Sequence, residues 1–147
     1  MKALFLDIDG VVCLHNEATG LNWGKGNDDF FDADCCRRLK EIIDITGCKI
    51  VLSSSWRLFP ESIRLMFKQF KPYGITREDF LGKTPSLQDR GDEILAYIKK
   101  HPQIEKFVAL DDEEYNSYAF PYGRLLLTKE ESGITEMIKN KCIQMLI

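Results

Sequence analysis

Four short, nearly continuous apolar runs constrain the fold of this chain more than any other feature of its sequence. The runs are ALFL at 3–6, KIVLS at 49–53, KFVAL at 106–110 and RLLLT at 124–128. A strand with one solvated face alternates apolar and polar side chains, whereas a strand buried on both faces is apolar throughout. The runs therefore predict the strands of a parallel sheet that is covered on both faces.

Helical patterns separate these runs and follow the last of them. Apolar side chains recur at helical spacing, which predicts helices over 33–46, 61–70, 91–100 and 134–146. Strands that alternate with such helices are typical of βαβ units. The sequence therefore predicts the α/β class, with a doubly wound, Rossmann-like parallel sheet and helices on both faces. Because single cores usually contain about 100–200 residues, we expect one domain over 1–147.

Composition and charge exclude several classes of protein. No apolar run approaches the roughly 18 residues of a membrane span, and the N-terminus lacks the long apolar region of a signal peptide. The five cysteines show no CxxC spacing, so we expect reduced, buried thiols in a cytoplasmic protein rather than disulfides or a zinc site. A net charge of −3 and a pI near 5.4 argue against tight non-specific binding to nucleic acid.

Polar side chains gather where three of the predicted strands end. They are Asp7-Ile8-Asp9-Gly10 after the first run, Ser53-Ser54-Ser55 at the end of the second, and Asp111-Asp112 after the third. Open parallel sheets bind ligands at the carboxyl ends of their strands. A single group of this kind would suggest a helix or turn cap, but four carboxylates at one edge repel one another unless a cation neutralises them. Oxygen ligands suit Mg²⁺, so the sequence predicts a magnesium site.

The segments LFLDIDGVV, KIVLSSSW and FVALDDEE, in this order, resemble the haloacid dehalogenase (HAD) superfamily of phosphotransferases. The resemblance implies a magnesium-dependent phosphatase with an aspartyl-phosphate intermediate. Asp7 would be the nucleophile that attacks phosphorus. Asp9 would be the general acid that protonates the leaving oxygen, and then the base that activates water. Gly10 lets the backbone bend away after the two aspartates and is counted with the predicted substrate-binding residues.

Two further roles implied by the resemblance have two candidates each. Ser53 would donate a hydrogen bond to a phosphoryl oxygen, and Ser54 is the alternative. The family also has a cation, usually lysine, that holds the aspartate and the phosphate together. RGDEI at 90–94 is similar to the family's lysine-glycine helix start and places Arg90 in that role, with Lys83 as the alternative. An arginine offers a planar fork in place of a point charge, so the chain departs from its family here.

The resemblance also implies the ligands of the magnesium ion. Asp111 would bind Mg²⁺ together with the Asp7 carboxylate and the Asp9 carbonyl. Asp112 would contact the ion directly or through a water molecule. The metal would offset the charges of the phosphate and the nucleophile, which otherwise repel each other.

The motifs lie too close together for a cap domain, which in many HAD enzymes encloses small substrates. We therefore expect an open site that accepts an exposed phosphate on a large substrate. SSSWR, GKTP, RGDEI, LDDE and ESGIT resemble the HAD domains of Swiss Army Knife RNA repair proteins. That resemblance implies phosphate removal from nucleic-acid ends or nucleotides, with a phosphoprotein as the other candidate substrate, and it places Arg57 near the phosphate.

Several interpretations stay open at this point. Trp56 is either a base-stacking residue or part of the core. Five basic residues form either a basic wall beside the site or a solvated surface: Arg57, Arg64, Lys68, Lys71 and Arg77. On a helix, Arg64, Lys68 and Lys71 would share one face. A non-catalytic HAD-like binding module is an alternative, because the usual lysine is missing. A response-regulator receiver domain is a poorer match, because it needs adjacent acids after the first strand.

Overall fold

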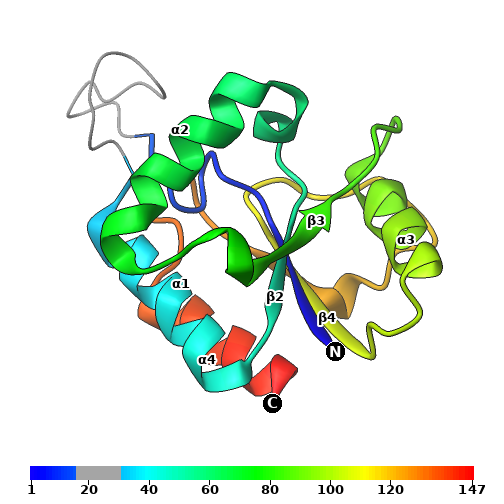
Figure 1. Cartoon of the computed structure of the whole chain (residues 1–147). Coiled ribbons are helices and arrows are strands. Elements are labelled where there is room, and N and C mark those ends of the chain that lie inside the picture. Colours follow the sequence, from blue (N-terminus) through cyan, green and yellow to red (C-terminus); the bar gives the residue numbers. More distant parts are fainter. Residues whose placement is uncertain (16–30) are drawn as a thin grey trace.

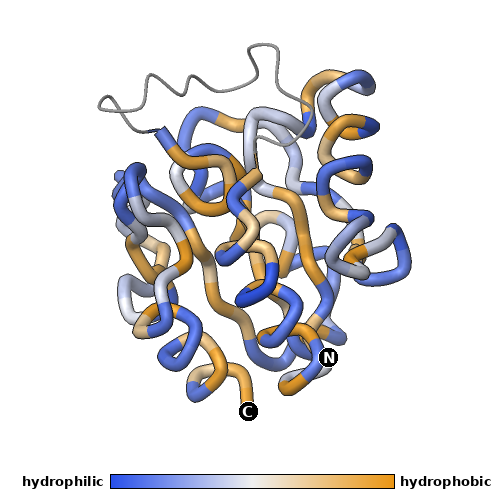
Figure 2. The backbone as a smooth tube through the Cα atoms, turned by 90° about the vertical axis from the view of Figure 1, so that its left-hand side faces the viewer, coloured by the Kyte–Doolittle hydropathy of each residue, from blue (hydrophilic) through white to orange (hydrophobic). Residues whose placement is uncertain are grey.

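The computed structural model describes residues 1–15 and 31–147, and a five-stranded sheet lies at the centre of this part of the chain. All strands are parallel, in the order β3-β2-β1-β4-β5. They are β1 (Lys2–Leu6), β2 (Lys49–Leu52), β3 (Phe80–Lys83), β4 (Lys106–Asp111) and β5 (Leu125–Leu127) (Figure 1). The predicted parallel sheet is therefore confirmed, and Figure 2 shows hydrophobic strands in the middle of the molecule.

Four α-helices of the described residues cover the two faces of this sheet. They are α1 (Ala33–Thr46), α2 (Pro60–Phe70), α3 (Arg90–Lys100) and α4 (Glu136–Leu146). Alternate residues of β1 face different helices. Leu4 and Leu6 belong to the apolar cluster that includes side chains of α1, α2 and α4, whereas Ala3 and Phe5 pack with α3. The predicted arrangement, with helices on both faces, is confirmed (Figure 1).

The edge strand β3 corrects the sequence interpretation. The sequence predicts no strand between the helices at 61–70 and 91–100, yet residues 80–83 pair with β2. The segment FLGK is short, contains a glycine and ends in a lysine, so it has neither an apolar run nor an alternating pattern. Pairing with a neighbour orders it. Lys83, the alternative cation, is the last residue of this strand.

Helix α4 begins later than predicted, at Glu136, because the Thr135 side chain caps it by accepting a hydrogen bond from the Ile138 N–H at 3.2 Å. Met137, which the spacing places on the apolar face, is 65% exposed. Lys139 is buried instead, and its ammonium group lies 2.6 Å from a carboxylate oxygen of Glu41 in α1. The contact between α1 and α4 is therefore partly ionic, which a pattern of apolar residues does not reveal.

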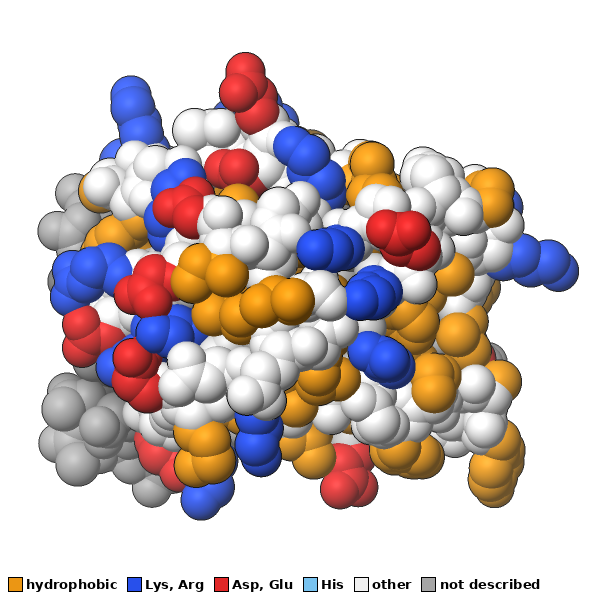
Figure 3. Space-filling view, turned by 90° about the horizontal axis from the view of Figure 1, so that it is seen from below, with side chains coloured by type: hydrophobic (Ala, Val, Ile, Leu, Met, Phe, Trp, Pro, Cys, Tyr) orange, Lys and Arg blue, Asp and Glu red, His pale blue; other side chains and the backbone are white. Residues whose placement is uncertain are grey.

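Lysines begin the three central strands at the amino edge of the sheet. Their ammonium groups donate to backbone carbonyls, in the pairs Lys2–Thr46, Lys49–Glu78 and Lys106–Ile147, at 3.3, 2.7 and 2.5 Å. Figure 3 views this edge and shows basic and apolar side chains side by side. Basic groups therefore hold the amino edge together, and the acidic residues of interest lie at the opposite, carboxyl edge.

Three other expectations can be compared with the described residues. All five cysteines are buried free thiols, as predicted. Within residues 1–15 and 31–147, no helix has both the length and the apolar character to cross a membrane. The same residues form only the sheet, its helices and short 3₁₀ turns, so this part of the chain contains no cap domain.

Candidate active site at the carboxyl edge

Strand pairing brings the predicted site residues to one edge. The Asp7 N–H donates to the Leu110 carbonyl of β4, and the Ser53 N–H donates to the Leu6 carbonyl of β1, both at 3.0 Å. Asp111 is the last residue of β4. These ladder hydrogen bonds continue the sheet by one residue beyond β1 and β2. The ends of β1, β2 and β4 therefore form one continuous site.

Three carboxylates crowd together at this edge. Asp7, Asp111 and Asp112 each offer one oxygen atom, and these atoms lie within 4.8 Å of one another. Burial, and then the charge of Asp111, raise the pKa of Asp7 from 3.8 to about 9. Burial and the Asp111 charge also raise the pKa of Asp112, to about 6. Carboxylates this close repel one another when all of them are ionised. A divalent cation that prefers oxygen ligands, such as Mg²⁺, would offset this repulsion.

Arg90 is the cation that the structure brings to this cluster. It is the first residue of α3, and its Nη1 lies 3.3 Å from Asp7 Oδ1 and 2.8 Å from Asp111 Oδ2. The alternative cation, Lys83, is exposed, and its Nζ donates to the Arg57 carbonyl at 3.4 Å. Of the two candidates from the sequence, Arg90 therefore contacts the nucleophile predicted from the motif.

Asp111 and Asp112 differ in how many hydrogen bonds they already accept. Asp111 accepts from Arg90, from the Tyr115 hydroxyl at 2.9 Å and from the Glu113 N–H at 3.1 Å. Neither Arg90 nor Tyr115 donates to Asp112, which is half-buried beside Asp7. Asp112 is instead hydrogen-bonded to Asp7, so each of the three carboxylates contacts another member of the cluster or the cation beside it. The sequence did not single out Tyr115.

Gly10 makes room for Asp112. Its φ is +79°, a region that favours glycine, and a Cβ at this position would overlap the Asp112 carboxylate. The Thr128 hydroxyl donates to the Gly10 carbonyl at 2.7 Å, which holds the turn after β1 in place. Gly10 therefore allows the acidic loop to approach closely, and its predicted contact with substrate stays a prediction.

Asp9 is held by Trp56. The indole Nε1 donates to Asp9 Oδ1 at 3.1 Å, and the indole ring packs against Phe31 with centroids 5.5 Å apart. Burial raises the pKa of Asp9, and the hydrogen bond from Trp56 opposes that change. A raised pKa suits a general acid. Of the two interpretations of Trp56, the structure fits a residue of the core. Its indole N–H also holds Asp9, the predicted general acid.

The serines after β2 have different partners. Ser54 Oγ accepts a hydrogen bond from the Trp56 N–H at 3.2 Å and caps the 3₁₀ turn η1 (Ser55–Leu58). Ser53 Oγ and Thr84 Oγ1 are buried without a hydrogen-bond partner among the described residues. A buried orphan hydroxyl is costly unless a ligand engages it. Ser53 is therefore the better phosphate donor of the two serines. The sequence did not single out Thr84, because this residue follows β3, a strand that the sequence does not predict.

Arg57 corrects another prediction. It is 5% exposed, and all five of its N–H groups are used within the protein. They donate to the carbonyls of Ser53, Ser54, Thr84 and Pro85 and to the Glu93 carboxylate, at 2.8–3.2 Å. The predicted contact of Arg57 with phosphate is therefore wrong. Arg57 instead ties the loops after β2 and β3 to helix α3.

Asp89 connects the two halves of the acidic site. Its carboxylate caps α3, and it accepts hydrogen bonds from the backbone N–H groups of Gly91, Asp92, Asn116 and Ser117 at 2.8–3.3 Å. The first turn of α3 carries Arg90, and the loop after β4 carries the acidic pair. Asp89 therefore fixes the cation relative to the carboxylates. An aspartate before a helix signals a cap in the sequence, but the contacts with the loop have no sequence signal.

Fold and site together define a class. The strand order, with acids after β1 and β4, is that of the Rossmann-like HAD fold. The chain matches the model for the HAD domain in Swiss Army Knife RNA repair proteins over residues 3–137, and it belongs to that family. Searches of curated proteins and of solved structures give no match. Membership supports phosphohydrolase chemistry at the level of the superfamily.

We expect Glu93→Gln to lower the free energy of unfolding by about 3 kcal/mol, because it leaves the buried Arg57 charge without its counter-ion. Urea denaturation measures this difference. Glu61→Gln is the control: it removes an exposed partner of Arg64 at 3.9 Å and should cost less than about 1 kcal/mol. Equal losses in the two variants would contradict the role given to Arg57.

The stability of the metal-free protein should fall as pH rises from about 4 toward 9. Over this range folded Asp7, with a pKa of about 9, keeps a proton that the unfolded chain, near 3.8, has lost. Thermal unfolding in EDTA at pH 6 and pH 8 measures the trend. Mg²⁺ should raise Tm more at pH 8 than at pH 6, because removing the proton from Asp7 costs less free energy at the higher pH. Asp7→Asn should flatten the dependence; an unchanged slope in that variant contradicts the assignment.

Proposed function

We propose that this protein is a Mg²⁺-dependent phosphomonoesterase that acts through an aspartyl-phosphate on Asp7. The observation that carries the proposal is the contact of the Arg90 guanidinium with both Asp7 and Asp111, at 3.3 and 2.8 Å. A cation beside a buried carboxylate places positive charge where a phosphoryl group and its nucleophile must meet. The adjacent hydroxyl of Ser53 supplies a donor without another partner.

In the first step of the proposed reaction, Asp7 attacks phosphorus. A carboxylate oxygen forms a bond to phosphorus, and the bond to the leaving oxygen breaks. Asp9, whose pKa is raised by burial, gives its proton to that oxygen. Trp56 keeps the Asp9 side chain in place through its indole N–H. The products of this step are the free hydroxyl compound and phosphorylated Asp7.

In the second step, Asp9 acts as a base. Its carboxylate takes a proton from a water molecule, whose oxygen attacks phosphorus and releases inorganic phosphate from Asp7. Arg90 and Ser53 hold the phosphoryl oxygens in both steps. The Asp7 and Asp111 carboxylates and the Asp9 carbonyl would hold Mg²⁺, with Asp112 in contact directly or through a water molecule. The ion would supply positive charge against the phosphate.

The proposed substrate is a phosphate on a nucleic-acid end or a nucleotide. The described residues form no cap domain, which leaves room for a large substrate, and the family description refers to RNA repair. A phosphoprotein and a non-catalytic binding role are the alternatives. Hydrolysis of p-nitrophenyl phosphate with and without Mg²⁺ separates an enzyme from a binding module.

Asp7→Asn should lower kcat/KM for p-nitrophenyl phosphate by at least a thousandfold, or about 4 kcal/mol in the barrier. Asparagine keeps the shape of the side chain but lacks the anionic oxygen that attacks phosphorus. Steady-state kinetics in Mg²⁺ measure the loss, and circular dichroism shows that the variant is folded. Activity within tenfold of the parent protein, or full activity in EDTA, would contradict the mechanism.

Arg90→Ala should abolish most turnover, and Arg90→Lys should recover a large part of it. Lysine keeps the charge and loses only the planar fork. Lys83→Ala should cost far less, because the structure directs Lys83 Nζ to the Arg57 carbonyl. The kcat/KM values of the three variants decide between the two cations. An inactive Lys83→Ala beside an active Arg90→Ala would reverse the assignment.

A further inference from the structure

Two buried hydroxyl groups have no hydrogen-bond partner among the described residues, and they are Ser53 Oγ and Thr84 Oγ1. Ser53 is fully buried, and Thr84 is 4% exposed. A buried hydroxyl without a partner destabilises the folded state, so its presence calls for a functional explanation. The proposed reaction uses Ser53 and assigns no role to Thr84.

The register of the sheet places Thr84 level with the catalytic edge. The last residues of β1, β2 and β3 are paired, Leu6 with Leu52 and Leu52 with Lys83. The N–H groups of the next residues in β2 and β3 donate to the carbonyls of Leu6 and Leu52, both at 3.0 Å, so the ladder continues by one residue. Neighbours in the resulting row are one strand spacing apart, about 4.8 Å. We call it the carboxyl row, and its members are Asp7, Ser53 and Thr84.

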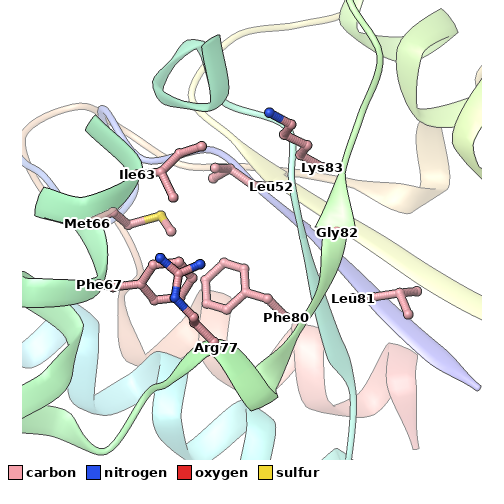
Figure 4. Close-up of a pocket in the computed structure, with 9 residues that line it drawn as sticks. All are labelled: Leu52, Ile63, Met66, Phe67, Arg77, Phe80, Leu81, Gly82 and Lys83. Atoms are coloured by element: carbon pink, nitrogen blue, oxygen red, sulfur yellow. The ribbon is translucent and has the colours of Figure 1, made fainter. Parts of the chain in front are cut away.

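The carboxyl row faces helix α3. Leu52 and Lys83 line a groove beneath α2, on the other face of the sheet (Figure 4). Successive side chains of a strand point to opposite faces, so the residues that follow Leu52 and Lys83 point away from α2. Gly82 shows the same alternation in β3, because a Cβ at this position would lie 2.8 Å from the Tyr97 hydroxyl of α3. The carboxyl row therefore points to the face covered by α3, the helix that begins at Arg90.

Arg57 holds the backbones of Ser53 and Thr84 at a defined separation. Its Nη1 donates to the Ser53 carbonyl at 3.2 Å, and its Nε donates to the Thr84 carbonyl at 3.1 Å. The backbone N–H groups of both residues are already used in the sheet. The two hydroxyls are therefore the polar groups of these residues that remain available to each other.

Thr84 is a neighbour of Ser53 but not of the nucleophile. Two strand spacings, about 10 Å, separate Thr84 from Asp7, which is beyond the reach of a phosphoryl group bound to Asp7. One spacing separates Thr84 from Ser53. Rotation about the Cα–Cβ bonds of these two side chains brings their oxygen atoms within hydrogen-bond distance. Thr84 therefore acts on the phosphoryl group only through Ser53.

We propose that Thr84 is a positioning residue that orients the Ser53 hydroxyl toward the substrate phosphate. This inference rests on the proposed phosphatase function and adds a residue to it. A serine hydroxyl has one proton and two lone pairs. When the Thr84 hydroxyl donates to Ser53 Oγ, the Ser53 proton is left for a phosphoryl oxygen. Successive hydrogen bonds in such a chain strengthen one another.

Thr84→Val removes the hydroxyl and keeps the shape of the side chain. Isothermal titration calorimetry of the full chain with inorganic phosphate in Mg²⁺ measures the effect. We expect the Kd to rise about fivefold, the usual effect of one hydrogen bond. Thr84→Ser keeps a hydroxyl and should stay within about twofold of the parent protein. An unchanged Kd in Thr84→Val would overturn the inference.

The Tm of Thr84→Val should equal or exceed that of the parent protein, because the change removes a buried group without a partner. Thr46→Val is the matched control. Thr46 is also buried, but it lies at the amino edge, and its hydroxyl donates to the Ile42 carbonyl at 2.6 Å and accepts from the Cys48 N–H at 3.2 Å. Its replacement should lower Tm and leave the phosphate Kd unchanged. Equal changes of Tm and Kd in the two variants would contradict the role given to Thr84.

A double-mutant cycle tests whether Thr84 acts through Ser53. Ser53→Ala alone should raise the phosphate Kd at least as much as Thr84→Val does. In the Ser53→Ala background, Thr84→Val should change the Kd less than about twofold, because the proton that Thr84 orients is gone. Equal losses from Thr84→Val in both backgrounds would show that Thr84 acts without Ser53, and the inference would fail.

Hydrolysis of p-nitrophenyl phosphate separates this inference from the proposed function. If the parent protein and Thr84→Val hydrolyse it with equal kcat/KM, the phosphatase assignment stands and the role of Thr84 fails. If the Kd values follow the cycle but the parent protein releases no phosphate, Thr84 serves a phosphate-binding site and the phosphatase assignment fails. A lower kcat/KM in Thr84→Val that Thr84→Ser restores supports both.

Discussion

Mutual repulsion among the carboxylates at the ends of β1 and β4 is the constraint on which the rest of the site depends. Asp7, Asp111 and Asp112 are held together by the sheet itself, because each follows or ends a strand whose position is set by its neighbours. Burial adds to the cost of ionising them. The structure offsets that cost with the guanidinium of Arg90 at the N-terminus of a helix, where the backbone dipoles add further positive charge.

Supporting contacts keep this cation in place from two directions. Asp89 joins the first turn of α3 to the loop after β4, and Arg57 joins the same helix to the loops after β2 and β3. The two side chains use opposite charges for the same purpose, because one accepts backbone N–H groups and the other donates to carbonyls. These hydrogen bonds hold the loops after β2, β3 and β4 and the start of α3 together at one edge of the sheet.

The sequence predicts those features that depend on local order and fails on those that depend on contacts between loops. Residues directly after apolar runs, such as Asp7 and Ser53, can be placed because a strand end has only one location in a parallel sheet. The strand at 80–83 could not be found, since pairing with β2 and not composition orders it. The orientation of Arg57 depends on Glu93, which lies far away in the chain. The residues next to Arg57 in the sequence therefore cannot show whether its side chain is buried or exposed.

The first turn of α3 carries consequences for how such a chain can evolve. Arg90 contacts the acids, Gly91 allows Ser117 to approach closely, Asp92 accepts a hydrogen bond from Ser117, and Glu93 neutralises Arg57. Four consecutive residues thus contact three separate parts of the structure: the acidic cluster, Ser117 and Arg57. Among related sequences, positions 57 and 93 should therefore covary, with the pair either retained as ions or replaced together by apolar residues, while single replacements at either position should be rare.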